Sequence, residues 1–383
     1  MIPYGRQDIT EADIDAVTAV LRSDFLTQGP VVPRFEAAVA AQCRVPHALA
    51  VNSATSALHL ACLALGLGPG DVLWTSPITF VASANCALYC GASVDFVDID
   101  PATYNLCPRA LEAKLIAAKA AGRLPKVVVP VHLAGQSPDM AAIRALADRY
   151  GFHVIEDASH AIGATYLGAP VGDCRYSDIT IFSFHPVKII TTGEGGMALT
   201  RDPALAARME LLRSHGITRD PALMSHAPDG PWYYQQIALG YNYRMTEIQA
   251  ALGLSQMARL GDYVARRRAL ARRYDARLEG LPLRIPFQHD DGSSAWHLYI
   301  VRLDPALDHL AVFEALRAAG IGVNLHYIPV HTQPCYAAMG FAPGDFPEAL
   351  RYYAGAISLP LYPGLTDAMQ DEVIAALRRA VTP

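Results

Sequence analysis

Helical and strand patterns alternate between about residue 35 and residue 255, and this alternation constrains the fold more than any other feature of the chain. Such a pattern is typical of a mostly parallel sheet covered by helices on both faces. The sequence therefore predicts an α/β fold. The expected helices span 32–43 and 53–67, and the expected short strands, rich in β-branched residues, span 47–52, 72–76, 93–100, 126–133 and 153–157.

The pattern changes after about Arg259. A chain of 383 residues is long enough for about two to three domains. We therefore expect an N-terminal segment and a large domain over residues 1–258 and a smaller α+β domain over residues 259–383. The second domain is predicted to hold a long basic amphipathic helix, a strand and two further helices, at 263–280, 296–304, about 310–319 and about 366–380.

Composition excludes several classes of protein. With 52% hydrophobic and 17% charged residues the chain can bury a large core, and its net charge of −5 argues against nucleic acid as a partner. The N-terminus has no charged segment followed by an apolar run, and no stretch approaches the roughly 18 apolar residues of a membrane-spanning helix. The seven cysteines lack the paired spacing of a metal site or a disulfide framework. We expect a cytoplasmic protein with free thiols, no bound metal and no membrane anchor.

Asp157 ends the expected strand at 153–157. Ligands of open parallel sheets gather at the carboxyl ends of the strands, so this carboxylate is expected to face the binding crevice. An aspartate before Ala-Ser-His can equally cap a helix or close a turn. The residue by itself leaves both interpretations open.

Lys188 stands thirty-one residues later, in a turn between an apolar strand and a return strand that begins near Gly195. A lysine in a turn is ordinarily solvated. Here, however, Val187 and Ile189 flank it and a Gly-rich turn follows, a setting that can desolvate the amine. Desolvation favours the neutral amine, which is the form that attacks an aldehyde. Together with Asp157 it forms the pair that pyridoxal 5′-phosphate requires, because the lysine binds the aldehyde and moves protons while the carboxylate keeps the pyridine nitrogen protonated.

The phosphate of such a cofactor needs a set of hydrogen-bond donors. Ala54, Thr55 and Ser56 begin the helix expected after Ser53, and the free amides and positive dipole end of a helix attract an anion. An ordinary helix N-cap would have the same sequence. Ser183 can add a hydroxyl to the phosphate.

Two rings complete the candidate cofactor site. Phe80 can stack on the pyridine ring or pack in the core. His160, three residues beyond Asp157, can hydrogen-bond that carboxylate or lie in the core.

Five segments, taken in order, carry a resemblance to a known family: LTQGP at 26–30, NSATSALHLA at 52–61, IEDASHAIG at 155–163, FSFHPVKIITTGEGG at 182–196 and LGYNYRMTEIQAALG at 239–253. They resemble the DegT/DnrJ-class sugar aminotransferases, which have the fold of aspartate aminotransferase (fold type I of the pyridoxal-phosphate enzymes). The resemblance implies that Lys188 is the Schiff-base lysine and that Asp157 pairs with the pyridinium nitrogen. It also implies a phosphate site of Ala54, Thr55 and Ser183, completed by Asn242 of the neighbouring subunit, and hence a homodimer with shared active sites.

Further stretches, among them SDFLTQGP, TSPITFVASANCALYCGA and ISLPLYP, look like the branch of this family that serves pseudaminic acid biosynthesis. That likeness implies transfer of the amino group of L-glutamate to C4 of a UDP-linked 4-keto-6-deoxy-N-acetylhexosamine. The chain departs from the pattern after VHTQP, where Cys335-Tyr336 stands in place of an expected aromatic pair. The implied substrate contacts are Tyr4, Leu26, Thr27, Gln28, Gly29, Ser56, His326, Tyr327, Ile328 and Pro329, although the last four alone read as a strand end and turn.

Several other functions compete with this one. The acceptor can be another nucleotide-linked 4-keto sugar, or the chain can be a pyridoxal-dependent lyase or sugar dehydratase on the same fold. Relatives with histidine at the lysine position remove a hydroxyl group from the sugar, so Lys188 indicates an aminotransferase. A non-catalytic regulator would need an output module, for which no segment is left over. A dinucleotide-binding dehydrogenase is disfavoured because GLGPGD at 66–71 is not G-x-G-x-x-G and leads into a strand.

Overall fold

The computed structural model describes residues 1–382 and is built around a seven-stranded sheet. Five adjacent strands are parallel, whereas β9 runs antiparallel to both of its neighbours, β8 and β1. The predicted mostly parallel α/β sheet is therefore confirmed. In spatial order the strands are β1 (His47–Val51), β9 (Gly196–Thr200), β8 (Ile179–Ser183), β5 (His153–Asp157), β4 (Val127–Val129), β2 (Val72–Thr75) and β3 (Ser93–Phe96).

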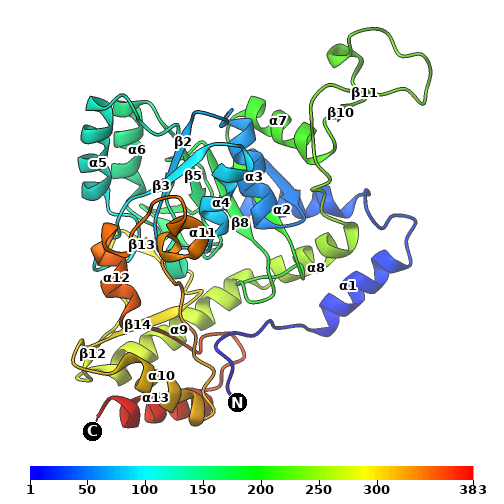
Figure 1. Cartoon of the computed structure of the whole chain (residues 1–383). Helices are drawn as coiled ribbons and strands as arrows, with labels where there is room; N and C mark the ends of the chain where they lie inside the picture. Colours follow the sequence, from blue (N-terminus) through cyan, green and yellow to red (C-terminus); the bar gives the residue numbers. More distant parts are fainter. Residues whose placement is uncertain (383) are drawn as a thin grey trace.

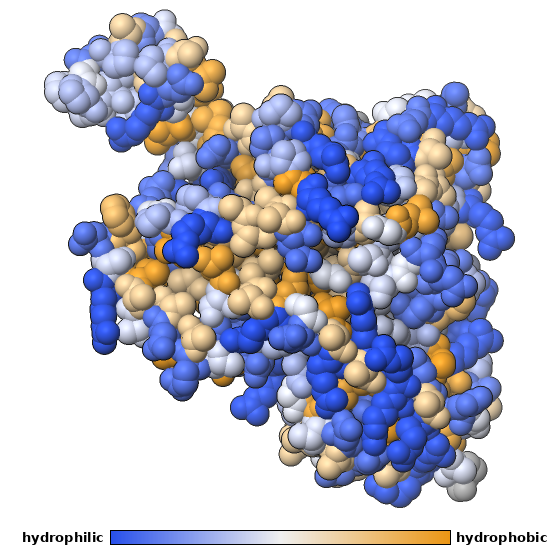
Figure 2. Space-filling view, turned by 180° about the vertical axis from the view of Figure 1, so that it is seen from behind, coloured by the Kyte–Doolittle hydropathy of each residue, from blue (hydrophilic) through white to orange (hydrophobic). Residues whose placement is uncertain are grey.

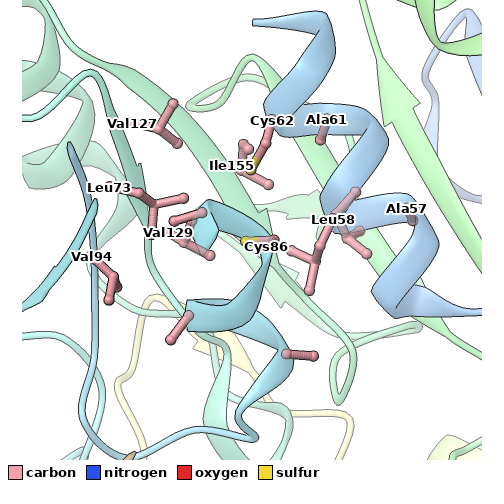
Figure 3. Close-up of a cluster of buried hydrophobic side chains, with 14 of the residues drawn as sticks. Ala57, Leu58, Ala61, Cys62, Leu73, Cys86, Val94, Val127, Val129 and Ile155 are labelled. Carbon is pink, nitrogen blue, oxygen red and sulfur yellow. The ribbon is translucent and has the colours of Figure 1, made fainter. Parts of the chain in front are cut away.

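Helices bury both faces of this sheet (Figure 1). Alternate strand residues point to opposite faces, so Val127 and Ile155 lie in one core cluster while Val128 and Val154 lie in another. Figure 3 shows the first cluster, packed under α3 and α4. The surrounding helices are α2 (Val31–Cys43), α3 (Ala54–Ala64), α4 (Ala82–Tyr89), α5 (Pro108–Ala120), α6 (Met140–Tyr150), α7 (Pro203–Arg213) and α8 (Glu247–Met257).

The C-terminal part forms a second core around a three-stranded antiparallel sheet. The expected boundary after residue 258 falls just before α9. The two parts share packing contacts, because Tyr336 and Phe346 of the C-terminal part pack edge-on against Phe96 of the large sheet. The division into two domains stays a prediction. The elements of this part are α9 (Leu260–Leu278), β12 (Leu283–Arg284), β14 (Tyr299–Leu303), α10 (His309–Ala318), α11 (Pro334–Ala337), α12 (Pro347–Tyr353), β15 (Ala356–Leu359) and α13 (Asp367–Val381).

The N-terminal segment joins the two parts from the outside. The N–H of Ile2 donates to the carbonyl of Gly320, and the N–H of Gly322 donates to the carbonyl of Ile2, at 2.9 and 2.7 Å. The chain then continues into α1 (Glu11–Leu21), which packs against α8. Residue 4 is thereby held on the C-terminal part of the molecule.

A long arm leaves the body after α7 and is paired only at its base, by β10 (Ile217–Thr218) and β11 (Gln235–Gln236). It stands clear of the rest of the chain in Figures 1 and 2. None of the helices within residues 1–382 is long and apolar enough to cross a membrane. The remaining short elements are β6 (Thr165–Tyr166), β7 (Ala169–Pro170), β13 (Gly292–Ser293) and four 3-10 turns at Leu133–Gly135, Pro221–Leu223, Val330–Thr332 and Pro343–Asp345.

Candidate active site

A cavity of about 690 Å³ opens where the parallel strands end and the C-terminal part begins. The structure brings together on its wall all but one of the residues predicted to hold the cofactor: Ala54, Thr55, Ser56, Phe80, Asp157, His160, Ser183 and Lys188. Tyr4, His326 and Tyr327, predicted to touch substrate, line the same cavity. One pocket therefore contains an amine, a carboxylate and a helix N-terminus.

Asp157 is the last residue of β5 and is buried. Its Oδ2 accepts a hydrogen bond of 2.6 Å from the hydroxyl of Ser83, and its Oδ1 accepts one of 2.6 Å from the hydroxyl of Ser159. The Ser159 N–H also donates to Oδ1, at 3.2 Å, so one oxygen does close the turn that the sequence left open as an alternative. No helix follows, and the carboxylate is held by two hydroxyl donors at the edge of the cavity.

Lys188 lies in the connection between β8 and β9, where its N–H donates to the carbonyl of His185 at 2.9 Å. The following residues Ile189 and Ile190 are buried in the core cluster that also contains Phe184. Burial lowers the pKa of the Lys188 amine to about 8, against the opposing attraction of Asp157. At pH 7 about a tenth of the amine is then neutral, compared with less than about a thousandth for an ordinary lysine.

The first turn of α3 points at the cavity. The Ser53 hydroxyl caps this helix by accepting from the Ser56 N–H at 3.1 Å, which leaves the amides of Ala54 and Thr55 without an intrahelical acceptor. The strand β9 passes very close to this turn, since a Cβ built on Gly196 would lie 2.5 Å from the Ala54 nitrogen. The site is therefore shaped to bind an anion such as the cofactor phosphate.

The opposite wall is aromatic. Phe80 is 59% exposed although it is a large apolar ring, and its centroid lies 6.2 Å from that of Tyr327. The ring of His326 is tilted against Tyr4 at 5.3 Å and stands edge-on to Tyr327 at 5.1 Å. An exposed ring at a cavity mouth is available for stacking, so Phe80 is not the core residue that the sequence left open.

Of the two places that the sequence left open for His160, the structure shows the buried one, because the ring does not hydrogen-bond Asp157. Its Nδ1 lies 3.2 Å from the Ala134 amide nitrogen, and its Nε2 lies 3.1 Å from the Tyr327 hydroxyl. The carboxylate is already occupied by two serines, which explains why the histidine turns to the neighbouring loop.

Several predicted contacts do not reach this cavity within one chain. Thr27, Gln28 and Gly29 line a separate cavity of about 610 Å³ between α7 and the base of the arm. Leu26 and Ile328 are exposed, Pro329 is buried, and none of them lies on the wall around Lys188. The main chain of Asn242 pairs with Ser214, and the residue is not among those that line the cavity. The roles predicted for these seven residues stay predictions.

Sequence reasoning missed Ser83, Ser159 and His297, which also belong to the site. Ser159 could have been found, because an aspartate two residues before a serine commonly forms a side-chain turn. Ser83 is separated from Asp157 by 74 positions, and no local signal links them.

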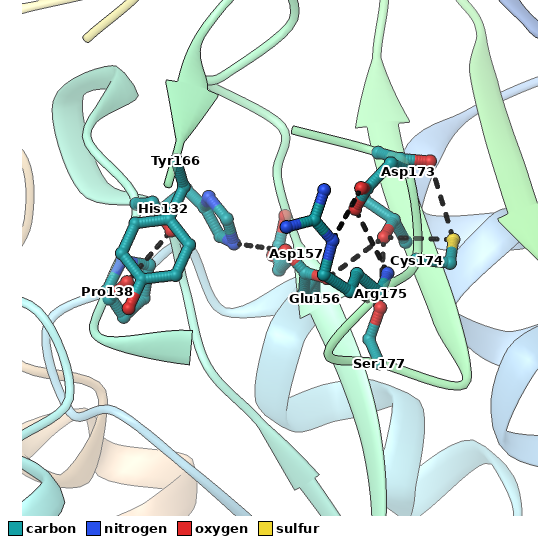
Figure 4. A network of polar contacts seen from close by, with 12 residues as sticks. His132, Pro138, Glu156, Asp157, Tyr166, Asp173, Cys174, Arg175 and Ser177 are labelled. Carbon is teal, nitrogen blue, oxygen red and sulfur yellow. Dashed lines mark hydrogen bonds and ion pairs between the residues drawn. The ribbon is translucent and has the colours of Figure 1, made fainter. Parts of the chain in front are cut away.

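A buried contact between His132 and Glu156 lies next to Asp157 (Figure 4). The Nε2 atom of His132 is 2.9 Å from Oε2 of Glu156, while Oε1 of the same carboxylate accepts from the hydroxyls of Ser177 and Thr180. Burial raises the pKa of Glu156, but His132 and the two hydroxyls outweigh burial and hold the pKa below its ordinary value. The His132 N–H donates to the Asp157 carbonyl at 3.0 Å, so this pair stiffens the strand end that carries the carboxylate.

Comparison with known proteins assigns the family. The sequence model of the DegT/DnrJ/EryC1/StrS aminotransferase family matches residues 7–378. The chain belongs to this family. It is a pyridoxal-phosphate-dependent sugar aminotransferase of fold type I, as the sequence predicted.

Relatives of this aminotransferase are similar along their whole length. The spore coat polysaccharide biosynthesis protein SpsC of Bacillus subtilis is 43% identical over 386 residues, which cover 99% of this chain and 97% of SpsC. The structure of the putative sugar aminotransferase Spr1654 from Streptococcus pneumoniae, in its PMP form, has a TM-score of 0.91 at 30% identity and covers 100% of this chain and 99% of that one. PseC of Helicobacter pylori, an aminotransferase involved in the biosynthesis of pseudoaminic acid, has a TM-score of 0.90 at 30% identity and covers 99% of both chains.

Proposed function

We propose that this aminotransferase moves the amino group of L-glutamate to C4 of a nucleotide-linked 4-keto sugar. The observation that carries the proposal is the Lys188 amine, whose pKa is lowered to about 8, on one cavity wall with Asp157 and the free amides of α3. As acceptor we propose a UDP-linked 4-keto-6-deoxy-N-acetylhexosamine of pseudaminic acid biosynthesis. The similarity to PseC and the aromatic wall of Tyr4, His326 and Tyr327 support that choice.

The roles of the chain's own residues follow from their places. Pyridoxal phosphate, when bound, supplies the aldehyde that captures an amine and a ring that accepts the electrons of the neighbouring carbon. Asp157, fixed by two serine hydroxyls, is suited to keep the ring nitrogen protonated, and the α3 amides are suited to hold the phosphate. Lys188, neutral for about a tenth of the time at pH 7, would take the proton from the α-carbon of the amino donor and would deliver it to the C4′ position of the bound cofactor. Such positioned proton transfer contributes about a hundred- to ten-thousand-fold to the rate.

The first experiment is an absorbance spectrum of the purified protein before and after L-glutamate, followed by a panel of UDP-4-keto-6-deoxy-N-acetylhexosamines. A yellow band that bleaches with glutamate and returns with one sugar would identify both donor and acceptor. Lys188→Ala is the matched control, because it should retain bound cofactor without turnover. A band that glutamate leaves unchanged would contradict the proposed reaction.

Another nucleotide-linked 4-keto sugar is the main competing acceptor, and the 43% identity to a spore coat polysaccharide biosynthesis protein favours testing sugars of surface polysaccharides in the same panel. A dehydratase is separated by stoichiometry. Transamination consumes one glutamate for each sugar product, whereas dehydration of the sugar consumes none.

We further propose that the enzyme works as a homodimer with shared sites. Large apolar side chains are exposed on and next to the arm: Trp232, in the arm, is 72% exposed, and Leu239, three residues beyond β11, is 78% exposed. Figure 2 shows apolar residues gathered at the arm's base and on the neighbouring face of the body. Exposed apolar patches of this kind are typical of protein interfaces. The turn at residues 27–29 and Asn242 would then face the Lys188 cavity of the partner, which accounts for their absence from their own.

Mixing two impaired variants tests the shared site. Lys188→Ala and Asn242→Ala dimers are each expected to be impaired, but a mixed dimer has one site with both native residues. Random exchange of subunits should therefore restore activity to about a quarter of the wild-type value. No recovery after verified exchange would show that Asn242 does not serve the partner's site.

A further inference from the structure

His160 is buried on the wall of the cavity, and each of its two ring nitrogens has a hydrogen-bond partner. The Nδ1 atom lies 3.2 Å from the Ala134 amide nitrogen. The Nε2 atom lies 3.1 Å from the Tyr327 hydroxyl, whose ring is nearly parallel to the imidazole at 24°. The direction of these two hydrogen bonds decides where the Tyr327 proton points.

The loop that carries the Ala134 amide is fixed by hydrogen bonds on both sides of that residue. The Leu133 N–H donates to the Asn105 side chain at 2.9 Å, and the Gly135 carbonyl accepts from the Ala295 N–H at 3.0 Å. Gly135 has a φ of +105°, and a Cβ there would lie 2.8 Å from the Trp296 nitrogen. The Ala134 N–H can only donate, so the Nδ1 atom of His160 must accept.

His160 is neutral in this site. Burial lowers its pKa well below the ordinary value, and the positive charges of Lys188, His326 and His132, when present, lower the pKa further. A neutral imidazole that accepts at Nδ1 carries its proton on Nε2 and therefore donates to the Tyr327 oxygen.

Tyr327 keeps its own proton, because burial and then the charges of Asp157 and Tyr4 raise its pKa far above the ordinary value. Its oxygen accepts from His160, and the hydrogen bonds of residues 1–382 give the hydroxyl no other partner. Its proton is thus free for an acceptor in the cavity that the ring lines. The Tyr327 ring packs edge-on against His326 at 5.1 Å and lies 6.2 Å from the Phe80 ring.

We propose that the Tyr327 hydroxyl, oriented through His160 by the Ala134 amide, donates a hydrogen bond to an oxygen of the bound ligand. The acceptor is either the phenolic oxygen of the pyridoxal ring or the keto oxygen of the acceptor sugar, and the second case rests on the proposed function. In both cases His160 is a positioning residue, which fixes the donor without touching the reacting carbon.

Tyr327→Phe tests the proposal, because it keeps the ring and removes only the hydroxyl. Tyr274→Phe is the matched control, since the Tyr274 hydroxyl donates at 2.9 Å to the Pro360 carbonyl, in the C-terminal core. The first readout is the pH titration of the visible band of the lysine-bound cofactor. A donor to the phenolic oxygen favours the deprotonated form, so its loss should raise the midpoint by about one pH unit.

The second readout is kcat/KM in each half-reaction. If the hydroxyl serves the keto oxygen, Tyr327→Phe should leave the midpoint and the glutamate half-reaction unchanged and lower kcat/KM for the sugar about three- to tenfold. His160→Gln retains one acceptor and one donor and should cause a smaller change than Tyr327→Phe in whichever readout responds.

Tyr327→Phe that matches Tyr274→Phe in both readouts would overturn the proposal. A larger effect from His160→Gln than from Tyr327→Phe would overturn the positioning role of His160. If the wild-type enzyme accepts no sugar of the panel, the proposed acceptor sugar is wrong, and the keto-oxygen case falls with it. The titration needs no sugar, so an unchanged midpoint in Tyr327→Phe would then overturn the remaining case, in which Tyr327 donates to the phenolic oxygen.

Discussion

Gly196→Ala is expected to weaken cofactor binding, because it would distort the proposed phosphate site without altering Lys188 or Asp157. Gly196 begins β9, and its added methyl group would lie 2.5 Å from the Ala54 nitrogen and 2.6 Å from the Ser53 carbonyl oxygen. These are backbone atoms of the first turn of α3, so no side-chain rotation can relieve the clash. Either the helix start or the strand start must move.

Overpacking of this kind typically costs about 1–3 kcal/mol. If about 2 kcal/mol of that cost is lost from the free energy of cofactor binding, the dissociation constant for pyridoxal phosphate rises about thirtyfold. The assay is titration of apo-protein with the cofactor, followed by absorbance, together with urea unfolding of the apo-protein to measure the part of the cost that appears as lost stability.

Gly261→Ala is the control, because a Cβ at this exposed position of α9 meets nothing within 4 Å. It adds the same methyl group and should leave cofactor affinity unchanged while stabilising the helix by up to about 1 kcal/mol. Wild-type affinity and wild-type stability in Gly196→Ala would refute the close approach of β9 to the helix start.

Two further predictions concern the catalytic pair. Because the pKa of the folded-state Lys188 amine is lowered to about 8, its burial destabilises the apo-protein fully below pH 8, and the cost disappears as the pH rises toward 10.5. Lys188→Met apo-protein should therefore be about 2–3 kcal/mol more stable than wild type to urea at pH 7.5 but nearly equal at pH 10, and a gap independent of pH would contradict the lowered pKa. Ser83→Ala removes a 2.6 Å donor from Asp157, so kcat/KM should fall at least about tenfold. Ser93→Ala, which loses only a bond to a surface carbonyl, should not change kcat/KM, and equal values for the two variants would show that Asp157 does not depend on Ser83.

The sequence predicted the sheet, and the place of Asp157 and Lys188 on it, because both depend on local patterns. Short β-branched runs between amphipathic helices define the parallel strands. Asp157 ends β5 and Lys188 lies five residues beyond the end of β8, at the edge where a parallel sheet gathers its ligands. The N-cap Ser53 likewise marks the start of α3 within one residue.

Contacts made across the fold could not be predicted in this way. Whether His160 meets Asp157 or Ala134 depends on Ser83, which reaches the carboxylate from a helix 74 positions earlier. The turn at 27–29 has a sequence that suits a binding loop, yet its place against α7 depends on the packing of α2 and α8, which no local pattern determines.

The two walls of the active-site cavity come from separate stretches of the chain. Residues between 54 and 188 supply the amine, the carboxylate and the anion site, whereas Tyr4, held on the C-terminal part, and His326 and Tyr327 supply most of the facing wall. If this facing wall binds the acceptor sugar, as we propose, then substitutions at these three residues would change which sugar is accepted while leaving the residues around Lys188 intact. Exchanging the N-terminal segment and the C-terminal part between relatives would then be a way to change acceptor choice.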